Sequence, residues 1–161
     1  MKFIDLSKQQ NIIKAKIDKR ISDVLQHGQY IMGREVFELE KKLSDYNNTK
    51  HCITCSSGTD AILMALMAKN IGKGDAVITT PFTFFSTAEV VSLLGATPIF
   101  IDIYNTTFNL NPDEIIKGII EAKKKNLNPK AIIPVDLFGT PSRYRKIMKI
   151  ALENDLFVIE D

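Results

Sequence analysis

The stretch AVITTPFTFFSTAEVVSLL, residues 76–94, contains a complete strand–loop–helix unit. Residues 76–79 form a short apolar run that predicts a buried strand, and residues 86–94 carry apolar side chains at helical spacing. The loop between them contains three phenylalanines and opens the helix. A strand followed closely by a helix is the repeating unit of α/β proteins, so this stretch predicts that class of fold.

The same alternation continues on both sides of this unit. Short connections between the elements imply right-handed crossovers, so we expect a parallel-rich sheet with helices on both faces. Asn111 and Pro112 make a favourable helix start, with a cap residue and a proline in the first turn. Apolar runs and helical periodicity predict strands at residues 51–54, 98–103, 131–135 and 156–159, and helices at residues 60–69, 112–125 and 141–153.

The beginning of the chain has a different pattern. Apolar residues at helical spacing predict amphipathic helices over residues 10–26 and 34–46, and the stretch 28–33, bounded by glycines, separates them. We therefore expect an N-terminal helical segment, residues 1–48, followed by the alternating part, residues 49–161. The Pro and Gly residues do not cluster, so they mark no linker between domains.

The composition excludes several classes of protein. Of the 161 residues, 45% are hydrophobic and 25% are charged, as in an ordinary soluble globular protein. The net charge of +2 is too small to indicate nucleic acid or an anionic membrane as a partner. A signal-peptide pattern is absent, and no apolar stretch approaches the ~20 residues of a membrane helix, so we expect a cytoplasmic protein.

Cys52 and Cys55 form a Cys-x-x-Cys pattern beside His51, which raises the question of a metal or redox site. Residues three apart in a strand point to opposite faces, and a structural zinc ion usually needs about four ligands. The sequence offers no second ligand pair, and two cysteines give no disulfide framework. We expect buried core thiols and no metal site.

The first candidate binding site is the stretch SSGTDA, residues 56–61, between a predicted strand and a predicted helix. A helix N-terminus has unpaired N–H groups and a partial positive charge, so it suits a phosphate group. Gly58 lets a ligand approach the backbone, and Ser57 or Thr59 can add a hydroxyl donor. The alternative is that Ser57 or Thr59 only caps the helix. The absence of Gly-x-Gly-x-x-Gly disfavours an NAD-dependent enzyme.

Further polar and aromatic residues follow the other strands. The aromatic loop 82–85 can cover a planar ligand, with Ser86 or Thr87 as helix cap, although core aromatics are the alternative. Asp136 and the pair Glu160–Asp161 place carboxylates at the same edge of the sheet. A phosphate site, a stacking ring and a carboxylate suit pyridoxal phosphate, because the carboxylate keeps the cofactor's ring nitrogen protonated.

Five motifs resemble those of the DegT-type nucleotide-sugar aminotransferases, a family of fold-type-I pyridoxal-phosphate enzymes: GQYIMG at residues 28–33, SGTDA at 57–61, TPFTF at 80–84, PVDLFG at 134–139 and VIED at 158–161. Each motif is weak alone, but the five occur in the same order over almost the whole chain. The resemblance implies the front part of a fold-type-I large domain, pyridoxal 5'-phosphate as cofactor, and a homodimer with active sites at the subunit interface.

The resemblance also implies roles for individual residues. The backbone amides of Gly58, Thr59 and Asp60, together with the Thr59 hydroxyl, would hold the cofactor phosphate. Phe84 would stack on the pyridine ring, and Asp161 would pair with its nitrogen.

The implied reaction is the transfer of an amino group, from glutamate, to a keto group of a nucleotide-linked sugar. Such reactions serve the biosynthesis of bacterial surface polysaccharides, including lipopolysaccharide, and the branch that makes 3-amino uronic sugars is the most similar. Tyr30 is the candidate substrate-side residue.

The chain departs from the family at its end. The Schiff-base lysine of the family lies downstream of the aspartate, and no lysine of this chain matches it. We therefore expect residues 1–161 to be an incomplete pyridoxal-phosphate-binding large domain that contains no catalytic residue and is inactive alone. The alternative is a truncated, non-catalytic remnant or a module that binds a phosphate ligand.

Overall fold

The computed structural model describes residues 3–161, which form two compact units, one ending at Thr54 and the other running from Cys55 to Asp161. Within the described residues, no helix has the length and apolar character needed to cross a membrane. Each unit is considered by itself below.

The first unit contains two helices, α1 (Leu6–His27) and α2 (Arg34–Asn47), which confirm the helices predicted there. Gly28 ends α1 in the left-handed region, with φ of 68°, and its N–H donates to the carbonyl of Val24. A Cβ atom at Gly33 would lie 2.4 Å from the carbonyl oxygen of Gln29. Both glycines of the GQYIMG motif are therefore required by the turn between the helices.

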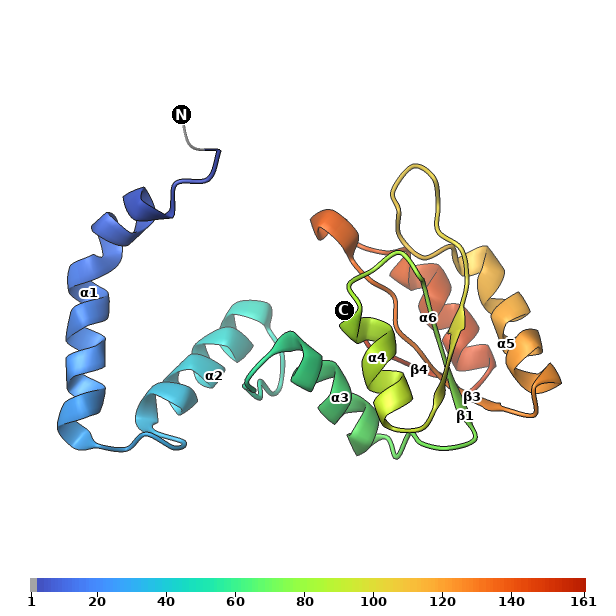
Figure 1. Cartoon of the computed structure of the whole chain (residues 1–161), viewed down its shortest axis with the longest axis horizontal. Helices are drawn as coiled ribbons and strands as arrows, with labels where there is room; N and C mark the ends of the chain where they lie inside the picture. Colours follow the sequence, from blue (N-terminus) through green and yellow to red (C-terminus); the bar gives the residue numbers. More distant parts are fainter. Residues whose placement is uncertain (1–2) are drawn as a thin grey trace. The chain divides into compact units, whose positions relative to one another are not determined.

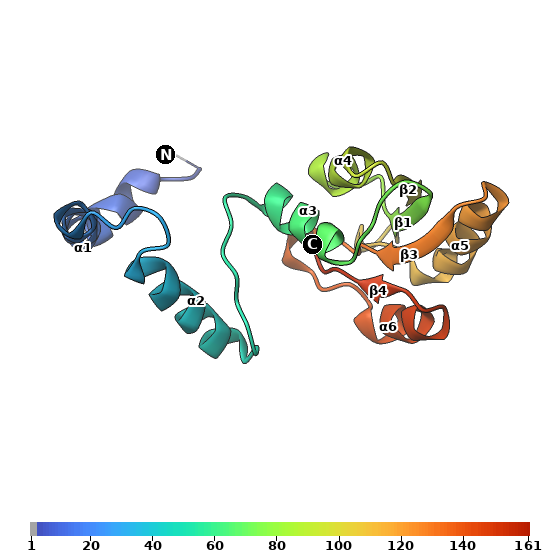
Figure 2. The same cartoon turned by 90° about the horizontal axis from the view of Figure 1, so that it is seen from below.

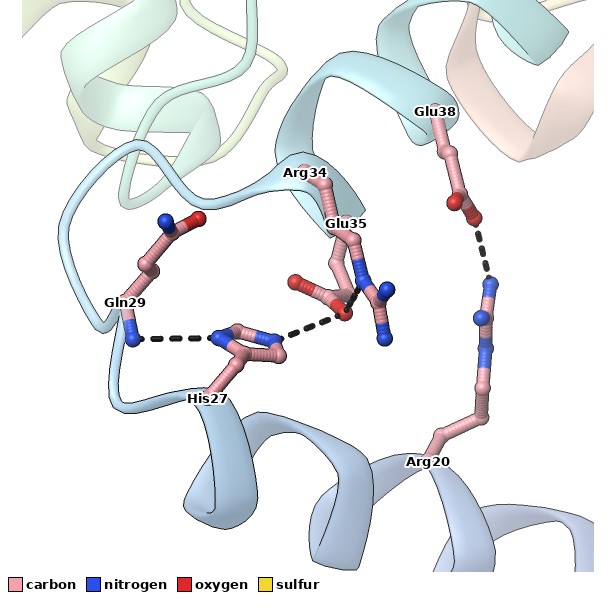
Figure 3. Close-up of polar contacts among 6 residues, drawn as sticks. All are labelled: Arg20, His27, Gln29, Arg34, Glu35 and Glu38. Carbon is pink, nitrogen blue, oxygen red and sulfur yellow. Dashed lines mark hydrogen bonds and ion pairs between the residues drawn. The ribbon is translucent and has the colours of Figure 1, made fainter.

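Side chains on both helices close this turn (Figure 3). Arg20 and Glu38 form an ion pair of 2.7 Å between α1 and α2. Nearer the turn, the Gln29 N–H donates to Nδ1 of His27 at 3.0 Å. Because Nδ1 accepts this bond, the proton of a neutral ring is on Nε2, from which it can be donated to Glu35.

The second unit is built on a sheet of four parallel strands (Figure 1). They are β1 (Asp75–Thr79), β2 (Thr97–Phe100), β3 (Asn128–Ile132) and β4 (Phe157–Val158), in the spatial order β2-β1-β3-β4. The predicted parallel α/β fold is confirmed. β2 and β3 end three residues earlier along the chain than the apolar runs that predicted them, and β4 ends one residue earlier.

Helices cover both faces of the sheet, as Figure 2 shows from below. α3 (Gly58–Ala68) and α4 (Ser86–Leu93) pack on one face, in a cluster that includes Val77. α5 (Ile115–Lys124) and α6 (Tyr144–Glu153) pack on the other, in a cluster that includes Ala76 and Ile78. Neighbouring residues of β1 thus serve opposite cores, as the period of a strand requires. Two short 3-10 turns, η1 (Pro112–Glu114) and η2 (Leu137–Gly139), complete the unit.

The strand order places a topological switch point between β1 and β3. From β1 the chain crosses to β2 on one side, and it then returns to the other side of β1 to form β3. Ligands of open α/β sheets bind at such a switch, outside the carboxyl ends of the strands.

The strand predicted at residues 51–54 is wrong. The segment is irregular, Ile53 is 79% exposed, and the Thr54 N–H and hydroxyl both donate to Glu40 at 2.9 Å. An apolar run becomes a strand only where a neighbouring strand completes its hydrogen bonds, and no such neighbour occurs within residues 3–161. The predicted buried thiols are also wrong, because Cys55 is exposed and Cys52 is only half-buried.

Candidate functional site

The carboxyl ends of the strands and the starts of α3 and α4 lie at one edge of the second unit. α3 ends at Ala68, shortly before β1 begins at Asp75, so its first turn lies at the opposite edge, where β1 ends. α4 starts at that edge too, and Figure 1 shows the C-terminus of the chain beside its first turn. The positions predicted to hold phosphate, ring and ring nitrogen therefore face the same side.

The first turn of α3 is capped by Ser57, whose Oγ accepts from the Asp60 N–H at 3.1 Å. The hydroxyls of Ser56 and Ser57 in turn donate to Oδ2 of Asp60, and these bonds lower the pKa of its carboxyl below the usual range. The capping alternative is confirmed for Ser57, and the Asp60 amide is already occupied. The N–H groups of Gly58 and Thr59 have no acceptor within the helix and remain available to a ligand.

Within residues 3–161, no backbone strain or close contact requires a glycine at position 58. Its backbone is not left-handed, and a Cβ atom built there meets no atom within 4 Å. Alanine stabilises a helix relative to glycine, by up to about 1 kcal/mol in a helix interior. Open space over a glycine at a helix N-terminus fits the close approach of an anionic group such as a phosphate.

The loop after β1 presents aromatic rings to solvent. Phe84 and Phe85 are 76% and 73% exposed, so the alternative of core aromatics is wrong for these two residues. Phe82 packs against Phe108, with ring centroids 5.5 Å apart, and helps to line a small hollow of about 240 Å³. The exposed ring of Phe84 is thus free to cover a planar group.

Asp161 is held at this edge by its backbone and by its side chain. Its N–H donates to the carbonyl of Pro134 at 3.1 Å, and its carbonyl accepts from the Asp136 N–H at 2.8 Å. The buried hydroxyl of Thr87 donates to Oδ2 of Asp161 at 2.6 Å, and the hydroxyls of Thr83 and Thr87 lie 2.9 Å apart. These contacts present an anchored carboxylate at an exposed position.

The predicted capping role of Ser86 or Thr87 is wrong, because no side chain caps α4. Phe85 already has helical dihedral angles, φ −54° and ψ −36°, and its carbonyl accepts from the Glu89 N–H. The helical conformation thus begins before the hydroxyl residues, which leaves Thr87 free to reach Asp161.

The Asp136 carboxylate serves the fold. Its Oδ1 accepts from the Ser142 N–H at 2.8 Å and from the Tyr144 hydroxyl at 2.9 Å, which fixes the start of α6. Burial, together with the hydrogen bond and charge of Asp136, raises the pKa of the Tyr144 phenol above its ordinary value. Of the carboxylates predicted at this edge, Asp161 is therefore the better placed to meet a ligand.

Tyr30 belongs to the first unit, in the turn between α1 and α2, and is 67% exposed. It helps to line a mainly apolar hollow of about 460 Å³ with residues of α1 that include Ile17 and Ile21. The structure therefore brings Gly58, Thr59, Phe84 and Asp161 into one unit and places Tyr30 in the other.

Sequence reasoning missed Thr83 as a site residue. The spacing of Thr83 and Thr87, four residues apart across a helix start, could have indicated that their side chains share a face. Their acceptor, Asp161, is remote in sequence, so no local pattern identifies it.

A model of the DegT/DnrJ/EryC1/StrS aminotransferase family matches residues 11–161. The UDP-2-acetamido-2-deoxy-3-oxo-D-glucuronate aminotransferase of Pseudomonas aeruginosa is 47% identical over 161 residues, which are 100% of this chain and 43% of that protein.

Two solved structures extend the comparison. A DegT DnrJ EryC1 StrS aminotransferase from Brucella abortus superimposes with a TM-score of 0.96 and 47% identity over 100% of this chain and 43% of that chain. NtdA from Bacillus subtilis, solved with bound cofactor PMP (pyridoxamine phosphate), gives a TM-score of 0.86 and 35% identity over 93% of this chain and 33% of that one. The chain thus spans between 33% and 43% of the length of these proteins.

Proposed function

The chain belongs to the DegT/DnrJ/EryC1/StrS aminotransferase family, and on that premise we propose that it forms the cofactor-binding part of a pyridoxal-phosphate-dependent sugar aminotransferase. The whole enzyme transfers an amino group, from glutamate, to a keto group of a nucleotide-linked sugar. One observation carries the proposal: a single unit presents free helix-start amides, an exposed aromatic ring and an anchored carboxylate at the ends of its strands.

The donor set fits the phosphate of this cofactor. The N–H groups of Gly58 and Thr59, together with the Thr59 hydroxyl, are the groups that would hold the phosphate. The open space over Gly58 leaves room for it. The Asp60 amide, which the resemblance also implies, is bonded to Ser57, so we assign Asp60 to the shape of the turn.

The ring of the cofactor would be held by two further residues. Phe84 would cover one face of the ring, and Asp161 would accept a hydrogen bond from the protonated ring nitrogen. When bound, the cofactor supplies an electron sink for the amino transfer. The chain's own part is to bind and orient the cofactor and to keep that nitrogen protonated.

The identity of the substrate is proposed from the relatives. The Pseudomonas aeruginosa protein is named for a UDP-linked 3-oxo uronic sugar, and we propose a substrate of that class, used for surface polysaccharides. We place Tyr30 on the substrate side, the Schiff-base lysine outside residues 1–161, and the reaction in a cytoplasmic homodimer. The large domain is then divided into the helical segment 1–48 and the alternating part 49–161.

The first test measures binding of pyridoxamine phosphate to the 161-residue chain by calorimetry. This form of the cofactor needs no covalent link to a lysine, and pyridoxamine without phosphate is the matched control. We expect the phosphate form to bind and the control to bind far more weakly. Equal binding of the two compounds would contradict the proposal.

The second test uses variants. Thr59→Ala should weaken binding by about 1.5–3 kcal/mol, because it removes a charge-assisted hydrogen bond, and Thr59→Ser should restore it. In the full-length enzyme, Asp161→Asn should keep much of the cofactor and lose most of the rate of amino transfer. Turnover close to that of the wild type would exclude the assigned role of Asp161. Amino transfer catalysed by the 161-residue chain alone would contradict the proposal that the Schiff-base lysine lies outside it.

A further inference from the structure

We infer that Thr87 is a positioning residue of this site, which holds one oxygen of the Asp161 carboxylate so that the other faces the cofactor's ring nitrogen. The inference rests on the proposed function. It starts from the 2.6 Å bond between the Thr87 hydroxyl and Oδ2 of Asp161.

The direction of the hydrogen bonds follows from the chemistry of the groups. An ionised carboxylate can only accept, so the single hydroxyl proton of Thr87 is donated to Asp161. The Thr87 oxygen is then the acceptor of its contact with Thr83, 2.9 Å away, and Thr83 is the donor. The three residues form a directed chain that ends on one carboxylate oxygen.

This series of hydrogen bonds fixes the side-chain conformation of Asp161, which the bonds of its backbone do not fix. The bonds of Asp161 to Pro134 and Asp136 hold its main chain but leave its side-chain torsions free. Asp161 is exposed, so without a partner its carboxylate would sample several rotamers. The bond from Thr87 selects one of them, and within residues 3–161 no hydrogen bond engages the second oxygen, Oδ1.

Thr87 has no other visible need for its hydroxyl. The residue is fully buried, and α4 begins without a side-chain cap. Burying a hydroxyl costs free energy unless the hydroxyl is hydrogen-bonded. The hydroxyl of Thr87 has two partners, Asp161, to which it donates, and Thr83, from which it accepts. The hydroxyl is therefore placed for the carboxylate and not for the helix.

The test uses pyridoxamine phosphate labelled with ¹⁵N in its ring, bound to the 161-residue chain and followed by NMR. The ¹⁵N shift reports whether the ring nitrogen carries a proton, at a pH where the free compound has lost it. We expect the wild type and Thr87→Ser to keep the nitrogen protonated. Thr87→Val has nearly the same shape but no hydroxyl, so it should lose protonation and bind about tenfold more weakly.

Thr83→Val is the second variant, at a half-buried position, and it leaves the Thr87 hydroxyl in place. It should shift the ¹⁵N signal in the same direction, with about threefold weaker binding, because it removes one neutral hydrogen bond from the chain. Thermal unfolding of each variant shows that the protein remains folded.

The outcomes separate the two hypotheses. If the wild type binds and Thr87→Val keeps the wild-type shift and affinity, the positioning role is wrong and the proposed function stands. Should Thr87→Val fail to fold, an unchanged shift in Thr83→Val would overturn the role in the same way. If the wild type does not bind pyridoxamine phosphate, both the proposed function and the inference fall.

Discussion

Nε2 of His27 lies 3.1 Å from Oε1 of Glu35, and this contact joins the end of α1 to the start of α2 (Figure 3). The two side chains are only 21% and 24% exposed. The other ring nitrogen accepts from the Gln29 backbone, so the imidazole connects both sides of the turn. The GQYIMG motif is thus held by a specific set of hydrogen bonds as well as by its glycines.

The first prediction concerns the pH dependence of this turn. Burial raises the pKa of Glu35, but hydrogen bonds from Arg34, from the Glu35 backbone and from His27 outweigh it and lower that pKa from 4.5 to about 2. The contribution of the ionised carboxylate is therefore present above pH 4.5 and lost as the pH falls toward 2. NMR of the Val36 amide, which donates to the Gly33 carbonyl at the start of α2, should show the turn loosening in that range. Glu35→Gln should remove this transition, and a transition that persisted would assign it to another group.

The second prediction distinguishes the two glycines of the turn. Gly33→Ala should open it, because the new Cβ would lie 2.4 Å from the Gln29 carbonyl. The Cβ atom of Gly28→Ala would contact no other atom. This substitution should therefore cost only the free energy of holding an alanine in the left-handed conformation, about 1–2 kcal/mol. Hydrogen exchange of the Tyr30 and Val36 amides, which donate to the carbonyls of Gly28 and Gly33, measures both effects. Equal effects would contradict the close approach at Gly33.

The third prediction separates stability from binding at Gly58. Gly58→Ala should stabilise the chain by about 0.4–1 kcal/mol, because alanine restricts the unfolded state and meets no atom in the fold. It should also weaken the binding of pyridoxamine phosphate, because the methyl group occupies the space left for the phosphate. Urea unfolding and calorimetry on the same sample check the two effects. Unchanged binding would mean that no ligand approaches this glycine.

The fourth prediction concerns Tyr144. Tyr144→Phe should destabilise the second unit by about 1.5–3 kcal/mol, because it removes a hydrogen bond to the Asp136 carboxylate. Tyr46→Phe is the matched control, since Tyr46 is 88% exposed, and it should change stability by less than about 0.5 kcal/mol. Urea unfolding measures both variants, and equal effects would argue against the contact.

The same tyrosine adds a dependence on alkaline pH. The pKa of Tyr144 in the fold is above its ordinary value of 10, so the neutral phenol is favoured there. Its contribution to stability is complete below pH 10 and is lost as the pH rises further. Tyr144→Phe should remove this part of the alkaline transition.

The sequence predicted helices better than strands for a physical reason. A helix satisfies its hydrogen bonds locally, so the pattern from Arg34 onward was sufficient to predict α2. Residues 51–54 had the composition of a strand but lacked the neighbour that a strand needs. The sheet order β2-β1-β3-β4 was not predicted, because side-chain periodicity does not show which strands pair.

The candidate site could be predicted only as separate positions. Gly58, the aromatic loop 82–85 and the pair Glu160–Asp161 follow from local motifs at strand ends, and the choice of Phe84 and Asp161 among them follows from the family resemblance. The bond between Thr87 and Asp161 joins residues far apart in the chain, and only the folded sheet brings them together. The structural role of Asp136 could not be predicted either, because its partner Tyr144 lies in the next helix and no local motif joins the two residues.

The order of the strands also has a kinetic consequence. Ala76 pairs with Thr97 in β2 and with Pro129 in β3, which is more than twice as far along the chain. Closing the longer loop costs about 0.8 kcal/mol more in chain entropy, so we expect β1 and β2 to associate first during folding. The junction between β1 and β3 then forms late, and the candidate site is completed only when this pairing, the most distant along the chain, is made.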